Sequence, residues 1–144
     1  MNEQDYVKVR LEDQINWYNE KSVANKRIFK LLRFIEIVAA ALIPFLSSHI
    51  DSPRNHISLL VGILGISIAI IAASLALFHF QENWINYRTA CESLKKEKFL
   101  FLTRAYPYNQ SDAFSTFVQR VEGQISKENT DWTKSLSKTE KKGE

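Results

Sequence analysis

Polar and apolar residues are strongly segregated along this chain of 144 residues, and the longest apolar run covers residues 57–80. Its sequence is ISLLVGILGISIAIIAASLALFHF, which contains no Lys, Arg, Asp or Glu and a single titratable side chain, His79. A helix of this length rises about 36 Å, and the hydrocarbon core of a bilayer is about 30 Å thick. A soluble chain of this size has too little mass to surround such a helix. We therefore interpret residues 57–80 as a transmembrane helix.

A shorter apolar run, residues 34–46, precedes this helix and contains Glu36. Only the ten residues 47–56 separate the two runs. Basic residues lie before the first run and after the second, at Lys26, Arg27, Lys30, Arg33, Arg88, Lys95, Lys96 and Lys98. The positive-inside rule then puts both termini in the cytoplasm. We predict a hairpin with spans at about residues 31–48 and 57–80, and the alternative is a re-entrant or interfacial first segment.

Both spans continue into polar sequence in which seam residues recur at helical spacing. These residues are Leu11, Ile15, Tyr18, Ser22, Asn25, Phe29 and Leu32 before the first span, and Trp84, Tyr87, Cys91, Leu94 and Lys98 after the second. We predict one helix over about residues 5–46. A second helix should continue without a break towards Tyr106, because no Pro or Gly lies between Ile66 and Tyr106. Antiparallel pairing of the two would form a cytoplasmic stalk, with Trp17 and Tyr18 opposite residues 84–87 in an aromatic cluster.

A third helix is predicted from about Asp112 to about Glu128, after Pro107 ends the second. Its apolar stripe consists of Phe114, Phe117, Val118, Val121 and Ile125. We expect this stripe to fold back onto the stalk, and the alternative is that it lies on the inner leaflet. The predicted fold is an all-α membrane protein with one domain over residues 1–132: a transmembrane hairpin of two long antiparallel helices, extended into a stalk, plus a short third helix. The polar residues 133–144 are expected to form a disordered tail.

Composition removes several classes of function. The net charge of +3 includes 16 acidic residues, so no concentrated basic surface indicates a nucleic-acid partner. The single cysteine, Cys91, excludes an internal disulfide and a cysteine-based metal cluster, and on this topology we interpret it as a small seam residue. On this topology His49, His56 and His79 do not form a metal site, because His79 lies at the other membrane surface. We therefore expect no enzymatic activity, no catalytic residues, no metal and no cofactor.

Small residues and serines define two lines along residues 57–80. Small side chains let membrane helices approach closely, so one line is predicted to be a helix-packing face; it consists of Gly62, Gly65, Ala69, Ala72 and Ala76. Almost opposite lie Ser67, Ser74 and Gln81, at intervals of seven residues. The serine hydroxyls could bond back to carbonyls of their own helix. Alternatively, the three residues could form a polar line facing a water-filled path between subunits.

Arg33 and Glu36 are the charged residues of the first span. Counting back from the turn puts Glu36 about 15 Å below the outer end of the helix, near the midplane. An ionised side chain there costs about 2.5–3.5 kcal/mol or more, so it should face protein or water and be paired. One interpretation is a local pair with Arg33, one turn away, or a helix shifted so that both lie at the inner surface. The other is a functional carboxylate in a pore.

Four stretches together resemble the SLATT superfamily of bacterial two-transmembrane effector domains, associated with SMODS and SLOG proteins, in a branch described as a domain of unknown function. They are RLEDQINWYNEKS (residues 10–22), ALIPFL (41–46), WINYRTACESLKKEKFLFLT (84–103) and FVQRVEGQISKENTDW (117–132). These are helix-packing signatures without a catalytic fingerprint. The resemblance implies a membrane effector that oligomerises into a pore when a bacterial conflict system senses infection or a nucleotide signal. It also implies a separate sensor or nucleotide-signalling partner.

The sequence leaves two classes of function open. The first is a homo-oligomeric pore-forming or channel-like effector in the bacterial inner membrane, multi-pass, with the lipid bilayer and further copies of itself as partners. The second is a non-conducting two-span scaffold whose stalk recruits cytoplasmic proteins. The two classes differ in whether the polar lines face a central axis of the assembly or are satisfied by partners within each hairpin.

Overall fold

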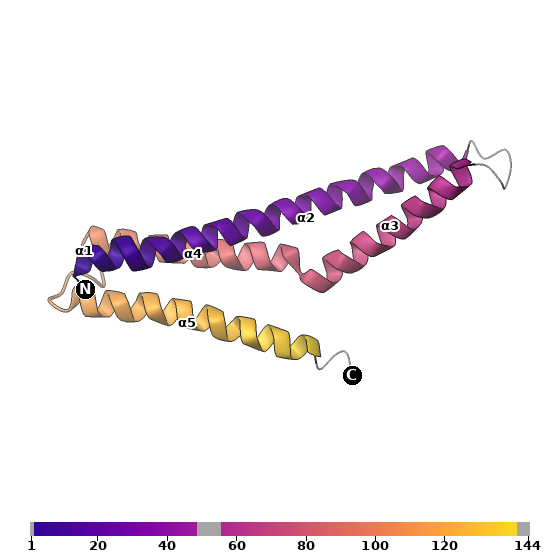
Figure 1. Ribbon diagram of the computed structural model, residues 1–144. Coiled ribbons are helices and arrows are strands. Elements are labelled where there is room, and N and C mark those ends of the chain that lie inside the picture. The colour runs from indigo at the N-terminus through magenta and orange to yellow at the C-terminus, as the bar shows by residue number, and fades with distance from the viewer. Residues whose placement is uncertain (1, 49–55, 141–144) are drawn as a thin grey trace. The chain divides into compact units, whose positions relative to one another are not determined.

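The structure, a computed structural model, describes the backbone of residues 2–48 and 56–140 and the side chains of residues 2–48 and 56–127 (Figure 1). Within these ranges all regular structure is helical: α1 (Glu3–Asp5), the π-helix η1 (Tyr6–Leu11), α2 (Glu12–Ser47), α3 (His56–Phe78), α4 (Phe80–Leu102) and α5 (Ala113–Glu140). The predicted all-helical class is therefore confirmed. Most of the predicted connecting loop, residues 49–55, lies outside the described residues.

The first three elements follow one another without a break, as the seam of apolar residues predicts. Asn2 caps the start, because its side-chain oxygen accepts a hydrogen bond from the backbone N–H of Asp5 at 2.7 Å. Helix then continues to Ser47, one residue beyond the predicted end. The single difference is η1, a wider turn of π-helix ahead of α2.

The second long helix is broken at His79, contrary to the prediction of a continuous helix. α3 ends at Phe78, α4 begins at Phe80, and His79 between them has a φ of 47°, in the left-handed region. Histidine enters this region more readily than most residues with a side chain. The Asn83 side chain donates a hydrogen bond to the carbonyl of Phe78 at 3.0 Å, which satisfies a carbonyl that the break leaves free.

The chain divides into two compact units. Unit 1 consists of Met1–Lys21 and Asn86–Glu144, and unit 2 of Ser22–Ile85. The boundaries fall inside α2 and α4, so both helices contribute residues to each unit.

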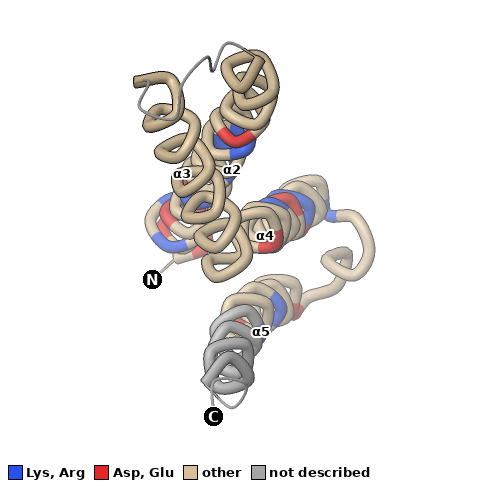
Figure 2. Tube along the Cα trace, turned by 90° about the vertical axis from the view of Figure 1, so that its right-hand side faces the viewer, with Lys and Arg blue, Asp and Glu red and all other residues tan. Residues whose placement is uncertain are grey.

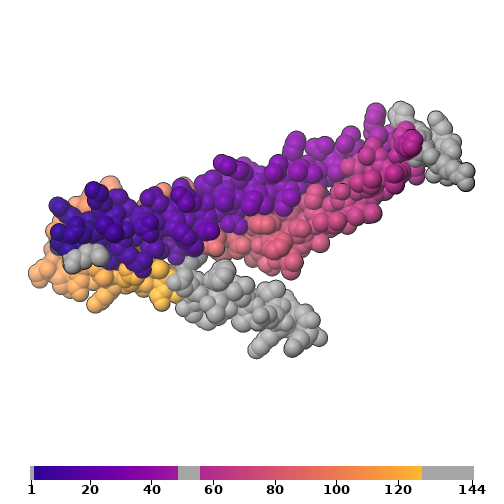
Figure 3. Space-filling model, viewed as in Figure 1, coloured from indigo at the N-terminus to yellow at the C-terminus, as the bar shows by residue number. Residues whose placement is uncertain are grey.

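Unit 1 holds the apolar core of the described residues. The N-terminal helix and α4 pair in antiparallel fashion, since Ile15 contacts Cys91 while Glu12 contacts Lys98. The first half of α5 covers this pair, and Figure 3 shows it against the N-terminal segment. The core consists of Tyr6, Leu11, Ile15, Tyr18, Cys91, Leu94, Phe101, Tyr108, Ala113, Phe117, Val121 and Ile125.

The predicted stripe of the third helix accounts for the α5 side of that core. The Phe117 and Phe101 rings stack with centroids 4.2 Å apart, and Val121 is fully buried. This confirms that the stripe folds back onto the helix pair rather than onto a membrane leaflet. α5 is longer than predicted, because its helical backbone continues past Glu128 to Glu140. The domain boundary after residue 132 stays a prediction.

Unit 2 is apolar and largely uncovered. α3 has no charged residue along its length, as Figure 2 shows, and none of its side chains is buried. One segment of the described chain, within His56–Leu102, is long and apolar enough to cross a membrane, with a mean hydropathy of 2.6. The first predicted span, residues 31–48, stays a prediction. Large apolar side chains more than half exposed in this unit are Leu31, Phe34, Ile37, Phe45, Leu59, Ile63, Ile66, Ile70, Leu77 and Phe78.

Candidate functional site

The two charged residues of the first predicted span form an ion pair within α2. Arg33 Nη1 lies 2.8 Å from Glu36 Oε2, one turn away. The Glu36 side chain is 17 % exposed and that of Arg33 is 56 % exposed. Glu36 lies on the same side of α2 as Ala39, the buried residue of this segment. The carboxylate therefore faces the inside of unit 2 and is neutralised locally, which is the first of the two interpretations that the sequence allows.

The serines of α3 use their hydroxyls within the helix. Ser67 Oγ donates to the carbonyl of Ile63, and Ser74 Oγ to the carbonyl of Ile70, each at 2.8 Å. Both serines are half-buried. Gln81 lies beyond the His79 break, which separates it from α3. The spacing was counted along an uninterrupted helix, and the place of Gln81 in the polar line stays a prediction.

The predicted packing face of α3 is open within the described chain. Gly62, Gly65, Ala69, Ala72 and Ala76 are all exposed. A Cβ built at Gly62 or Gly65 would meet no described atom within 4 Å. The side of α3 that is partly covered is a different one, which includes Val61, Leu64, Ile68 and Ile71. Close packing on the small-residue face therefore requires a helix from outside the described part of this chain.

Three of the four predicted stalk aromatics meet in unit 1. The Trp17 ring lies edge-on to Tyr18 at 5.0 Å and to Tyr87 at 5.7 Å, measured between ring centroids. Tyr18 is buried, but Trp17 is 44 % exposed. Trp84 belongs to unit 2, where its carbonyl accepts a hydrogen bond from Ser22 and its ring lies under Lys26 at 5.4 Å.

A clamp that the sequence did not predict joins η1 to α5. Arg10 donates two hydrogen bonds of 3.1 Å to the carboxylate of Glu122, and Tyr6 donates a third of 2.9 Å. The bond from Arg10 holds the pKa of Glu122 below its usual value, and burial opposes it in part. Burial, and then the bond to Glu122, raises the pKa of Tyr6.

A second clamp of the same chemistry joins α4 to α5. Arg120 donates to both oxygens of Glu97, at 2.8 and 3.2 Å, and the Tyr108 hydroxyl donates to the same carboxylate. Burial of Glu97 works against its ionisation, but the bonds from Arg120 and Tyr108 outweigh it and lower its pKa. Burial, and then the bond to Glu97, raises the pKa of Tyr108. The sequence contains one indication of this clamp: Glu97 is a carboxylate between Leu94 and Phe101 on the buried face of α4, where it needs a partner.

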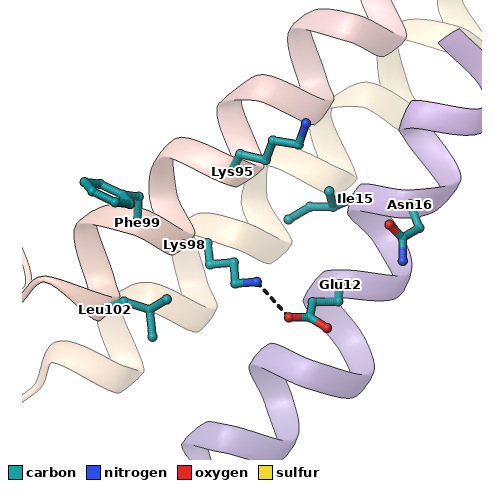
Figure 4. A pocket seen from close by; sticks show the side chains of 7 residues that line it. All are labelled: Glu12, Ile15, Asn16, Lys95, Lys98, Phe99 and Leu102. Atoms are coloured by element: carbon teal, nitrogen blue, oxygen red, sulfur yellow. Dashed lines mark hydrogen bonds and ion pairs between the residues drawn. The ribbon is translucent and has the colours of Figure 1, made fainter. Parts of the chain in front are cut away.

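A groove of about 390 Å³ lies between α2 and α4 in unit 1 (Figure 4). An ion pair crosses it, in which Lys98 Nζ is 2.7 Å from Glu12 Oε1, and this bond lowers the pKa of Glu12. Phe99 and Leu102 form an exposed apolar wall. The groove is lined by Glu12, Ile15, Asn16, Lys95, Lys98, Phe99 and Leu102.

Cys91 is fully buried and its thiol contacts the carbonyl of Ile15 at 3.6 Å, as expected of a seam residue. No group of three His, Cys, Asp or Glu side chains among residues 2–48 and 56–127 could hold a metal ion. The sites that remain are the polar and small-residue faces of unit 2 and the groove of unit 1.

Comparison with known proteins identifies a family but no characterised relative. The model of the family described as a protein of unknown function, DUF4231, matches residues 13–115, so the chain belongs to that family. No curated protein and no solved structure matches it. The matched region includes all of unit 2 and α4 and ends near the start of α5.

Proposed function

We propose that this member of the DUF4231 family is an integral membrane protein that crosses the bilayer twice and assembles from several copies into a pore or channel-like effector. The observation that carries the membrane part is the apolar surface of unit 2. The span candidate in α3 has none of its residues buried, and ten large apolar side chains of the unit are more than half exposed. In water this surface would drive aggregation, whereas in lipid it needs no further cover.

Assembly from copies is supported by the open face of α3. Small residues in lipid allow backbones to approach, and the positions around Gly62 and Gly65 are empty. A second copy presenting the same face would fill them. Both termini would be cytoplasmic, in the bacterial inner membrane, with unit 1 as the stalk.

Conduction rests on the resemblance to SLATT effector domains and on the polar side of unit 2. On assembly Glu36 would separate from Arg33 and supply one carboxylate per subunit to the path, and rings of carboxylates select cations. A separate sensor or nucleotide-signalling protein would trigger opening and would act on the cytoplasmic unit.

A non-conducting scaffold is the second candidate, and two contacts favour it. Arg33 already neutralises Glu36, and the hydroxyls of Ser67 and Ser74 are bonded within α3. In a scaffold these groups need no water, and the groove of unit 1 would bind a cytoplasmic partner.

Ion flux separates the two candidates. Purified protein in liposomes should pass cations, and Glu36→Gln should lower the cation preference while oligomer size stays constant. Glu20→Gln removes the same charge outside the predicted spans and serves as the control. Absence of flux from the wild type, with Glu36→Gln behaving like Glu20→Gln in every assay, would favour the scaffold.

A further inference from the structure

Three basic side chains of unit 2 have no acidic partner among the described residues. Lys26, Arg27 and Lys30 are exposed on α2, and no ion pair includes any of them. The two described carboxylates of this unit are engaged elsewhere, Glu36 with Arg33 and Glu82 with His79 at 3.5 Å. The three cations are therefore an uncompensated positive charge.

These cations lie at one level of the helix, just before its apolar segment. Residues 26, 27 and 30 fall within about one turn and share one side of α2. That side is next to the partly buried side formed by Ser22, Asn25 and Phe29. The apolar run 34–46 begins one turn later. In a membrane this level is the headgroup region of the cytoplasmic leaflet.

Trp84 adds a donor at the same level. Lys26 Nζ lies 5.4 Å above its ring, so the two side chains are neighbours. Its indole N–H is enclosed and has no hydrogen-bond acceptor among the described residues. Tryptophan is typical of the membrane interface, where its ring is apolar and its N–H meets headgroups. Donors therefore outnumber acceptors here, and an acceptor from outside the described chain reaches this N–H once a neighbouring side chain moves aside.

We infer that Lys26, Arg27, Lys30 and Trp84 form a binding site for the phosphate of an anionic phospholipid of the cytoplasmic leaflet. The inference rests on the membrane location proposed above. A phosphodiester supplies oxygen acceptors and a negative charge, and its acyl chains would lie along the exposed apolar surface of α2 that starts at Phe34. The site is separate from the Arg33–Glu36 pair, so it does not depend on conduction.

Lipid titration tests the site. The full chain in neutral detergent is titrated with phosphatidylglycerol or phosphatidylcholine, and bound lipid is counted by native mass spectrometry. We expect a preference for phosphatidylglycerol that falls about fivefold for each charge removed in K26Q/R27Q/K30Q. The matched control, K8Q/K96Q/K127Q, removes the same charge from exposed lysines of unit 1 that form no ion pair with a described residue. Trp84→Phe keeps an aromatic ring but removes the indole N–H. Added to either triple variant, it should weaken phosphatidylglycerol binding further.

Three outcomes would overturn the inference. Equal binding of both lipids by the wild type is the first, and an equal loss of binding in the two triple variants, which would indicate bulk charge, is the second. Competition by inorganic phosphate alone would indicate a soluble anion instead of a lipid.

Alkaline carbonate extraction of membranes distinguishes failure of the lipid site from failure of the proposed function. If the wild type is extracted, the membrane location is wrong and the lipid site with it; if it stays in the membrane and shows no lipid preference, only the lipid site is wrong. Circular dichroism shows whether the variants remain helical.

Discussion

Glu97 is a carboxylate on the apolar face of its helix, and the groups around it explain why it is tolerated there. Only 4 % of the residue is exposed, and an unpaired charge in that position would be costly. The guanidinium of Arg120 supplies the opposite charge through two bonds, and Tyr108 supplies a third. The clamp therefore both satisfies Glu97 and ties α5 and the preceding loop to α4.

Tyr108→Phe should destabilise unit 1 by about 1.5–3 kcal/mol, because it removes a hydrogen bond to a buried carboxylate and leaves the ring in place. Tyr106→Phe is the matched control, since Tyr106 is 79 % exposed and its hydroxyl forms no hydrogen bond with a described residue. Chemical unfolding of both variants, followed by near-UV circular dichroism, measures the difference. Equal stability of the two would show that the hydroxyl of Tyr108 contributes nothing.

Sequence pattern predicts which residues face inward but not which polar groups they meet. Leu11, Ile15 and Tyr18 were predicted from spacing alone and are buried, because burial of one helix face follows from periodicity. The partners of Glu122 lie 112 and 116 residues away from it, at Arg10 and Tyr6. No local pattern indicates a pairing over that distance, so the Glu122 clamp became visible only in the folded chain, whereas the place of Glu97 on the buried face of α4 already indicated a carboxylate in need of a partner.

Among the elements, α5 depends most on charge for its position. Its apolar stripe would pack against any apolar surface, whereas Arg120 and Glu122 fix its register against two different helices. Two such clamps on either side of Val121 hold the stripe in one place. This argues that unit 1 has a single well-defined packing.

Acid should release α5. The pKa values of Glu97 and Glu122 are lowered on folding from an ordinary value of 4.5. A lowered pKa contributes stability above the unfolded-state value, and that contribution is lost as the pH falls through the folded-state value. The opening of α5, measured as the exchange rate of its amides divided by their intrinsic rate at the same pH, should therefore be flat from neutral pH to about 5 and rise below about 4.5. Glu122→Gln should flatten this rise, and Glu20→Gln, which removes no ion pair, should not.

The break between α3 and α4 at His79 was not predicted from the sequence. The usual signals for ending a helix are Pro and Gly, and neither is present there. The break falls instead where apolar α3 gives way to polar α4, at a residue with a φ of 47°. A left-handed histidine depends on its neighbours, here the Asn83 side chain on the Phe78 carbonyl, and such a local bond is not readable from hydropathy. The predicted alignment of Gln81 with the serines was counted along a continuous helix, and this break interrupts that count.

At the scale of the whole molecule, the two units differ in how completely their faces are covered. Unit 1 has a closed core with satisfied buried charges, whereas the small-residue face of α3 in unit 2 is open. Gly65→Leu should therefore leave the fold of a single chain intact, because its Cβ meets nothing, and should reduce oligomer size by blocking close approach of a second copy. Ile66→Leu introduces the same side chain at a neighbouring exposed position as the control. Light scattering in detergent measures both, and an unchanged oligomer in Gly65→Leu would exclude this face as the interface.

The number of crossings decides whether unit 2 is a hairpin in the membrane, and the two termini report it. If both α2 and α3 cross, Asn2 and Lys142 lie on the same side, and the positive-inside rule makes that side the cytoplasm. If α3 alone crosses, the termini lie on opposite sides. Single cysteines at Asn2, Ser48 and Lys142, in a Cys91→Ser background, can be labelled in intact cells with a maleimide that does not cross membranes. We expect labelling at Ser48 alone, and labelling at all three after permeabilisation. Labelling of Asn2 or Lys142 in intact cells would contradict the charge argument, and labelling of one of them without the other would show a single crossing.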